Sequence, residues 1–252
     1  MRIILSLSFL IFSAVHLPCY TQNSKIIRIN EDIQLVPLKD SIFIHISYHS
    51  ADGFGRFPSN GLFIINNGKA VMIDTPMDTI KTLILIDYLK DSMGVRVNRF
   101  IAGHFHADCM GGLATVHKKN IESLANIRTV EICKELGFPV PLKSFHDSLI
   151  LNYEGKEVVC HYPGPGHTED NIVVWLPEDE ILFGGCLVKS AGSRNLGNLE
   201  DANVGEWDNT LRNLLKRYPE VEIVVPGHGN AGGIELIHHT LKLVSEYKQQ
   251  AF

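Results

Sequence analysis

The feature that most constrains this fold is a group of six residues of the types that bind metal ions, spread from the middle of the sequence to near its end. Each of the six ends an apolar, β-branched run or follows a glycine-rich turn. Strands can aim such side chains rigidly, and loops at strand ends let them converge. We therefore expect the six to meet at one place in the fold. They are His104, His106, Asp108, His167, Cys186 and His228.

The six residues divide into two chemically different sets. One set holds three histidines (His104, His106 and His167), and the other holds Asp108, Cys186 and His228. Imidazole and thiolate ligands favour zinc over magnesium or calcium. Closed structural zinc sites use four protein ligands, whereas catalytic sites use three and leave a position for water. The pattern therefore predicts two catalytic zinc sites, and the structural-zinc alternative is disfavoured.

Length and composition limit the number of domains and the kinds of partner that the chain can have. A chain of 252 residues with 45% hydrophobic and 20% charged residues is typical of one large globular domain or two small ones. The net charge is −5, and no run of Lys or Arg is present. A groove that follows a phosphate backbone is therefore not expected, and nucleic acid is excluded as a predicted partner.

The N-terminal residues have the character of a secretory signal. Arg2 supplies a positive charge, and residues 3–17 form an apolar stretch too short to span a bilayer. The predicted cleavage is before Gln22, which makes 1–21 a signal peptide and 22–252 the catalytic domain. A lipoprotein signal ending at Cys19 is the alternative, although Pro18 in front of it is a poor match. The mature form is expected to be exported, with no membrane segment.

Hydrophobic periodicity predicts antiparallel hairpins interleaved with single helices, in two similar halves. This pattern favours two sheets packed together with helices outside and the ligands along one edge. A helix is expected after the N-cap Asp78, with Leu83, Ile86 and Leu89 on one face and Gly94 at its end. The other expected helices include 129–136, 207–218 and 234–247, and the expected strands are 33–36, 42–47, 62–65, 70–73, 99–102, 121–125, 145–151, 157–161, 172–176, 181–183 and 222–225.

Seven stretches of the chain resemble the metallo-β-lactamases, in particular the two-zinc subclass whose second site uses Asp, Cys and His. The chain is most similar to the broad-spectrum, carbapenem-hydrolysing members, over essentially the whole mature sequence. The matching stretches are 58–61, 74–76, 104–112, 170–177, 181–186, 196–198 and 224–229.

The resemblance implies an α+β fold, the four-layer αββα sandwich, and a periplasmic location. It implies one zinc ion on His104, His106 and His167 and a second on Asp108, Cys186 and His228. The implied activity is hydrolysis of the β-lactam ring of penicillins, cephalosporins and carbapenems through a zinc-bound hydroxide, which confers antibiotic resistance. The implied partner is a small-molecule β-lactam, and we expect a monomer.

Other activities occur on the same fold, which alone does not choose among them. Dizinc lactonases, thioesterases and nucleases usually carry a second His after the motif Asp and an Asp in place of Cys186; here Cys109 follows Asp108. We expect Cys109 to lie near the zinc site without binding zinc. A single-zinc subclass has Asn in place of the first motif His, which His104 excludes. A non-enzymatic zinc-buffering protein is a further alternative.

Four residues are expected to act on the substrate. Asp108 orients the nucleophile or relays a proton, and Lys189 binds the substrate carboxylate. Asn198 donates a hydrogen bond to the developing oxyanion. Phe54, at the tip of a hairpin, is expected to close over the substrate as a flap. The alternatives are a solvated surface lysine, a turn asparagine and an exposed hairpin tip. Asp74 is the candidate for orienting the first histidine cluster.

Overall fold

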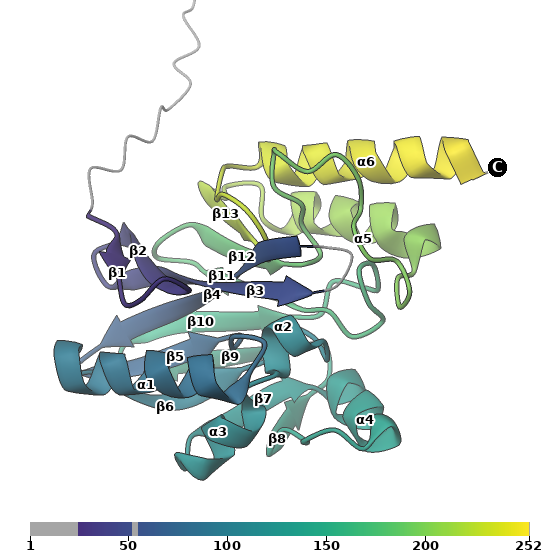
Figure 1. The fold of residues 1–252 in the computed structure, drawn as a ribbon. Coiled ribbons are helices and arrows are strands. Elements are labelled where there is room, and N and C mark those ends of the chain that lie inside the picture. Colours follow the sequence, from purple (N-terminus) through teal and green to yellow (C-terminus); the bar gives the residue numbers. More distant parts are fainter. Residues whose placement is uncertain (1–24, 52–54, 252) are drawn as a thin grey trace, which may run out of the picture.

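A computed structural model describes residues 25–51 and 55–251 of the chain (Figure 1). The predicted signal peptide at 1–21 and the predicted flap residue Phe54 lie outside the described residues.

The first sheet has eight strands in the order β1 to β8. Its strands are β1 (Ile27–Arg28), β2 (Ile33–Lys39), β3 (Ile42–Ala51), β4 (Gly55–Asn66), β5 (Lys69–Ile73), β6 (Arg96–Ile101), β7 (Glu122–Asn126) and β8 (Lys143–Phe145). Pairing is antiparallel from β1 to β5 and parallel from β5 to β8. Asn67 and Gly68 have φ of 48° and 71°, as the tight turn between β4 and β5 requires.

Helices connect the parallel strands of this sheet. They are α1 (Thr79–Met93), α2 (Ala107–Met110), α3 (Leu113–Lys118) and α4 (Ile127–Leu136). The Asp78 carboxylate accepts a hydrogen bond from the Lys81 backbone N–H at 2.7 Å, and Gly94 ends α1 with φ of 66°. Both predicted caps of α1 are thereby confirmed.

The second sheet has five strands in the order β13-β12-β11-β10-β9. They are β9 (Ser148–Tyr153), β10 (Lys156–His161), β11 (Val173–Leu176), β12 (Ile181–Gly185) and β13 (Ile223–Pro226). The strands β12 and β13 run parallel, and α5 (Val204–Arg217) forms part of the connection between them. The C-terminal helix α6 (Glu235–Ala251) lies beside α5 (Figure 1).

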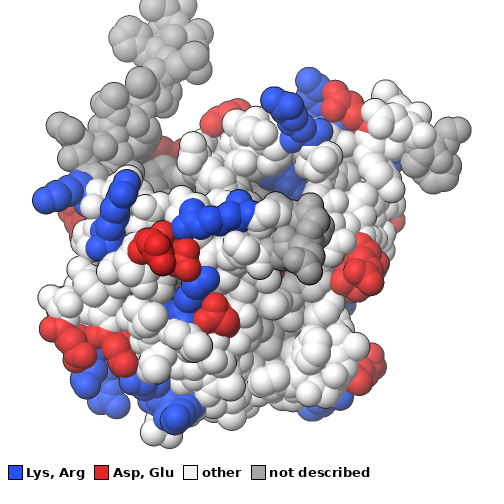
Figure 2. Space-filling view, viewed as in Figure 1, with Lys and Arg blue, Asp and Glu red and all other residues white. Residues whose placement is uncertain are grey.

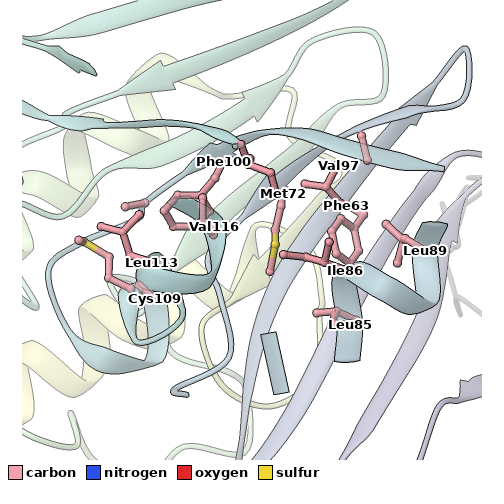
Figure 3. Packing of buried hydrophobic residues seen from close by; sticks show 14 of the residues in the cluster. Phe63, Met72, Leu85, Ile86, Leu89, Val97, Phe100, Cys109, Leu113 and Val116 are labelled. Atoms are coloured by element: carbon pink, nitrogen blue, oxygen red, sulfur yellow. The ribbon is translucent and has the colours of Figure 1, made fainter. Parts of the chain in front are cut away.

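Three apolar clusters hold four layers together. The middle cluster lies between the two sheets and includes Val71 and Ile73 of β5. Met72, between them in the strand, faces the opposite way and packs with α1, as the two-residue period of a strand dictates. Figure 3 shows Met72 and Phe63 beside Leu85 of α1. A third cluster lies between the second sheet and helices α5 and α6. The predicted αββα sandwich is confirmed (Figure 1).

Two expectations about elements were wrong. The strand expected at 145–151 is two strands, β8 and β9, which belong to different sheets. The chain leaves the first sheet after Phe145 and enters the second at Ser148, and the polar residues His146 and Asp147 lie at this change of sheet. In α1, Leu83 is 39% exposed. Ile86 and Leu89 do lie on the buried face as expected, and Thr82 and Leu85 complete that face in place of Leu83.

Charged side chains of both signs lie beside one another on the face that Figure 2 shows. Among the ion pairs are Arg56–Asp32 at 3.0 Å and Lys81–Asp32 at 3.3 Å. Within residues 25–51 and 55–251, no helix combines the length and the apolar character that crossing a bilayer demands.

Candidate metal centre

Four of the six predicted ligands lie in loops that follow strands, and His106 and Asp108 lie at the start of the short helix α2. His104 comes three residues after β6, His106 is the N-cap residue of α2, and Asp108 is in the first turn of that helix. Cys186 directly follows β12, and His228 lies two residues after β13. His167 is in the loop between β10 and β11. The sheet edge predicted from the sequence therefore brings all six together.

A buried carboxylate shapes the loop that carries the first ligands. Asp74 is 1% exposed and accepts a hydrogen bond from the Gly103 backbone N–H at 2.6 Å. A Cβ at Gly103 would lie 2.9 Å from both Asp74 carboxylate oxygens, so only glycine fits this close approach. Asp74 thus holds the backbone before His104. Asp74, the candidate for orienting the first histidine cluster, acts on the loop backbone, because this hydrogen bond comes from Gly103 and not from an imidazole.

The three histidines form a compact group. Ring centroids lie 4.7 Å apart for His104 and His106, 4.9 Å for His104 and His167, and 5.2 Å for His106 and His167. One ligand nitrogen from each ring lies within 4.8 Å of the others. Among the described residues, Nε2 of His104 and Nδ1 of His167 are buried without a hydrogen-bond partner. An unsatisfied buried polar group costs about 1–3 kcal/mol, so the group is built to be completed by a ligand.

Burial keeps two of these histidines in the form that binds metal. It lowers the pKa of His104 to about 3 and the pKa of His167 well below its usual value. Both rings are therefore neutral near pH 7, and a neutral imidazole is the metal-binding form.

Asp201 orients the third histidine, and no sequence pattern had indicated it. Nε2 of His106 donates to Oδ2 of Asp201 at 2.9 Å, which leaves Nδ1 as the nitrogen available to a metal. The two residues are 95 positions apart, and Asp201 lies in a loop without periodicity. Only the folded structure could place it beside His106.

Asp108, Cys186 and His228 form the second group. Sγ of Cys186 lies 3.3 Å from Oδ2 of Asp108 and 3.4 Å from Nε2 of His228, and the last two atoms are 3.1 Å apart. Ligand atoms around a tetrahedral zinc ion stand roughly 3.3–3.7 Å apart, given its bond lengths. Nδ1 of His228 donates to the Pro58 carbonyl at 2.7 Å, which frees Nε2 for a metal. Both the spacing and the donor types fit zinc.

The charge states of this second group also suit a cation. Burial opposes ionisation of Asp108, but the hydrogen bond from His228 and the nearby His104 outweigh it and hold the pKa of Asp108 well below its usual value. A hydrogen bond from the Cys109 thiol stabilises the Cys186 thiolate and, despite burial, lowers the pKa of Cys186 to about 6. Two of the three residues are thus anionic near neutral pH.

The two groups open into a cavity of about 730 Å³. Lys189 and Asn198, both predicted to bind substrate, line it, as do Phe57 and Met77, which sequence reasoning had missed. The ring of Phe57 lies 6.2 Å from that of His228, centroid to centroid. Phe57 lies between Arg56 and Pro58 and Met77 between Pro76 and Asp78, so neither belongs to a periodic apolar pattern that could have indicated its place.

The side chains of Lys189 and Asn198 differ in their environment. Burial lowers the pKa of Lys189, although the negative charges of Cys186 and Asp108 oppose the shift. Its Nζ lies 5.2 Å from the centroid of the Trp207 ring. Asn198 is exposed, and its Oδ1 accepts a hydrogen bond from the Glu200 backbone N–H at 3.1 Å. The turn that the sequence left as an alternative is therefore present.

Fold and ligand groups together define a zinc-dependent hydrolase, and comparisons with known proteins agree. Residues 135–228 match the family described as the metallo-β-lactamase superfamily. A type 2 metallo-β-lactamase of Bacteroides fragilis is 41% identical, over 91% of this chain and 92% of that protein. A type 2 metallo-β-lactamase of Bacillus cereus is 40% identical, over 84% of this chain and 82% of that protein. The structure of a metallo-β-lactamase from Pontibacter korlensis superposes with a TM-score of 0.82 at 33% identity, over 84% of this chain and 99% of that one.

The chain belongs to the metallo-β-lactamases of type 2. It carries two candidate zinc sites, the three-histidine group and the Asp-Cys-His group.

Proposed function

We propose that this chain hydrolyses the β-lactam ring of penicillins, cephalosporins and carbapenems and thereby confers resistance to them. The observation that carries the proposal is the placement of both ligand groups at a cavity that Lys189 also lines. The similarity to type 2 metallo-β-lactamases supports it, because a β-lactamase cleaves the β-lactam ring.

Six side chains would hold two zinc ions. His104, His106 and His167 would bind the first, and the second would be bound by the remaining set, Asp108, Cys186 and His228. When bound, the zinc ions supply Lewis-acid polarisation of the lactam carbonyl and lower the pKa of water for attack.

The other residues bind and orient the reactants. The Lys189 ammonium pairs with the carboxylate of the substrate. Asp108 lies between the two groups, with Oδ1 3.8 Å from His104 Nε2, and its ionised carboxylate orients the attacking water. The hydrogen bond to Glu200 occupies Oδ1 of Asn198, so its NH₂ group is the part left to donate to the carbonyl oxygen as negative charge develops.

The setting of the enzyme is part of the same proposal. Residues 1–21 direct export and 22–252 form the catalytic domain, which acts in the periplasm as a monomer on a small-molecule substrate. The apolar stretch 3–17 after Arg2 supports this.

The test is imipenem hydrolysis by the purified, zinc-loaded protein, followed by the loss of substrate absorbance. Lys189→Ala should raise KM roughly 10- to 100-fold with a smaller effect on kcat, because a charge-assisted hydrogen bond contributes about 1.5–3 kcal/mol. Lys242→Ala, on the exposed side of α6 near Glu246, is the matched control and should behave as wild type. Turnover of a thioester or lactone without imipenem hydrolysis would contradict the proposal.

A further inference from the structure

A further potential ligand, Cys109, lies beside residues of both zinc groups. Sγ of Cys109 is 3.1 Å from Nδ1 of His104. One ligand atom from each of His104, Asp108, Cys109 and Cys186 lies within 4.8 Å of the other three. This set shares three residues with the two zinc groups, and Cys109 alone is new.

The position of Cys109 is fixed by its surroundings. It is 2% exposed, and its backbone carbonyl accepts a hydrogen bond from the Thr75 N–H at 2.8 Å. Figure 3 shows it at one end of the apolar cluster, beside Leu113. A thiol held in this way does not have to be ordered when a metal binds. One ring nitrogen of the buried His104 belongs to the same four-residue set.

The set differs from both zinc groups in softness and in ligand number. It combines two sulfur ligands with one imidazole and one carboxylate, and thiolates prefer soft cations. Four protein ligands also close a tetrahedral site, whereas catalytic zinc sites keep an open position. A cation in this position would therefore have no site left for water or substrate.

We propose that His104, Asp108, Cys109 and Cys186 form an alternative, closed site for a soft divalent cation such as Cd²⁺. The cation binds the Cys186 thiolate and also Cys109, whose S–H bond breaks and releases one proton to solvent. It withdraws both Asp108 and Cys186 from the second group. The closed site and the two-zinc arrangement therefore exclude one another.

The inference extends the ligand assignment of the proposed function, so its test uses a readout other than activity. Metal-free wild-type protein is titrated with Cd²⁺, and thiolate-to-cadmium absorption in the ultraviolet is measured per bound ion. We expect the intensity of two thiolates in the wild type and about half of it in Cys109→Ser. Cys133→Ser, which alters a buried thiol in α4, should match the wild type.

Equal intensity per ion in wild type and Cys109→Ser would overturn the proposal. If Cys109→Ser does not fold, ¹¹³Cd resonances of the unmutated protein decide. A resonance in the range of two sulfur ligands supports the closed site, and one in the range of a single sulfur contradicts it. Imipenem hydrolysis by the zinc-loaded wild type tests the proposed function separately, because it does not depend on Cys109 binding cadmium.

Discussion

His104 connects the parts of the metal centre. Its Nδ1 lies 3.1 Å from the Cys109 sulfur, its Nε2 lies 3.8 Å from Asp108 Oδ1, and its ring stands edge-on to those of His106 and His167. Few side chains could replace an imidazole here, because both of its ring nitrogens face potential partners. This residue therefore couples the occupancy of one metal group to the geometry of the other.

The hydrogen bond between His106 and Asp201 gives a test at the same scale. Asp201→Asn removes the anionic acceptor of Nε2 and leaves the ring less firmly oriented. Removing such an outer partner typically costs 10- to 100-fold in metal affinity, so we expect a loss of about that size for the first zinc ion. Competition with a chromogenic chelator measures it. Glu200→Gln, which changes the neighbouring acid, should keep wild-type affinity; equal losses in both variants would contradict the role of Asp201.

The sequence predicted the six metal ligands, but it did not predict the residues that hydrogen-bond to them or pack beside them. The six ligands could be predicted because each follows an apolar run or a glycine turn, which marks a strand end. Asp201 and Phe57 carry no such mark, because their role comes from contacts made only in the folded chain. Phe54 stays a prediction.

At the scale of elements, close backbone approach after β13 shapes the second group. The Gly227 N–H donates to the Gly185 carbonyl at 2.7 Å. A Cβ at Gly227 would lie 2.4 Å from the Cys186 sulfur and 2.7 Å from its backbone nitrogen. Glycine is therefore required for His228 and Cys186 to reach the same metal.

Gly227→Ala tests this requirement. The added methyl group must displace Cys186, so we expect about one bound zinc ion per chain in place of two and a lower free energy of unfolding, by about 1–3 kcal/mol. Metal analysis and urea unfolding measure the two effects. Gly192→Ala is the control, because within the described part of the chain its Cβ would have no neighbour inside 4 Å. Two zinc ions retained in Gly227→Ala would refute the steric argument.

The helices and strands were predicted correctly where interactions between residues close in the sequence determine their ends. Asp78 and Gly94 mark the ends of α1, since a cap is a local interaction between neighbouring residues. The split of 145–151 into β8 and β9 was missed because the choice of sheet depends on distant strands. Asn126, whose amide donates to the His146 carbonyl at this break, gives no sign of it in the sequence.

At the scale of the whole molecule, a buried histidine in the first sheet makes stability depend on pH. His45 is 1% exposed, and its Nε2 lies 3.2 Å from the Ile73 carbonyl. Burial lowers the pKa of His45 to about 4 despite its backbone hydrogen bonds. The unfolded chain therefore binds more protons than the folded one between pH 6.5 and about pH 4, and stability falls as the pH drops through this range.

The contribution of His45 is measurable from how steeply the free energy of unfolding changes with pH in the wild type and in a variant. His45→Gln should lose less of its unfolding free energy than wild type between pH 6.5 and 4, by up to about 3 kcal/mol. Urea unfolding at several pH values, with the zinc concentration fixed, gives the curves. His238→Gln, at an exposed site on α6, should run parallel to wild type. A His45→Gln curve that is also parallel would show that burial of His45 does not carry the effect.

The proposed activity requires two zinc ions held by the six side chains, and one titration tests this requirement directly. Metal-free protein receives zinc in steps, and bound zinc and imipenem hydrolysis are measured in the same samples. We predict saturation at two zinc ions per chain, with hydrolysis absent from the metal-free protein and abolished again by EDTA. Saturation at one ion, or hydrolysis undiminished by the chelator, would contradict the account.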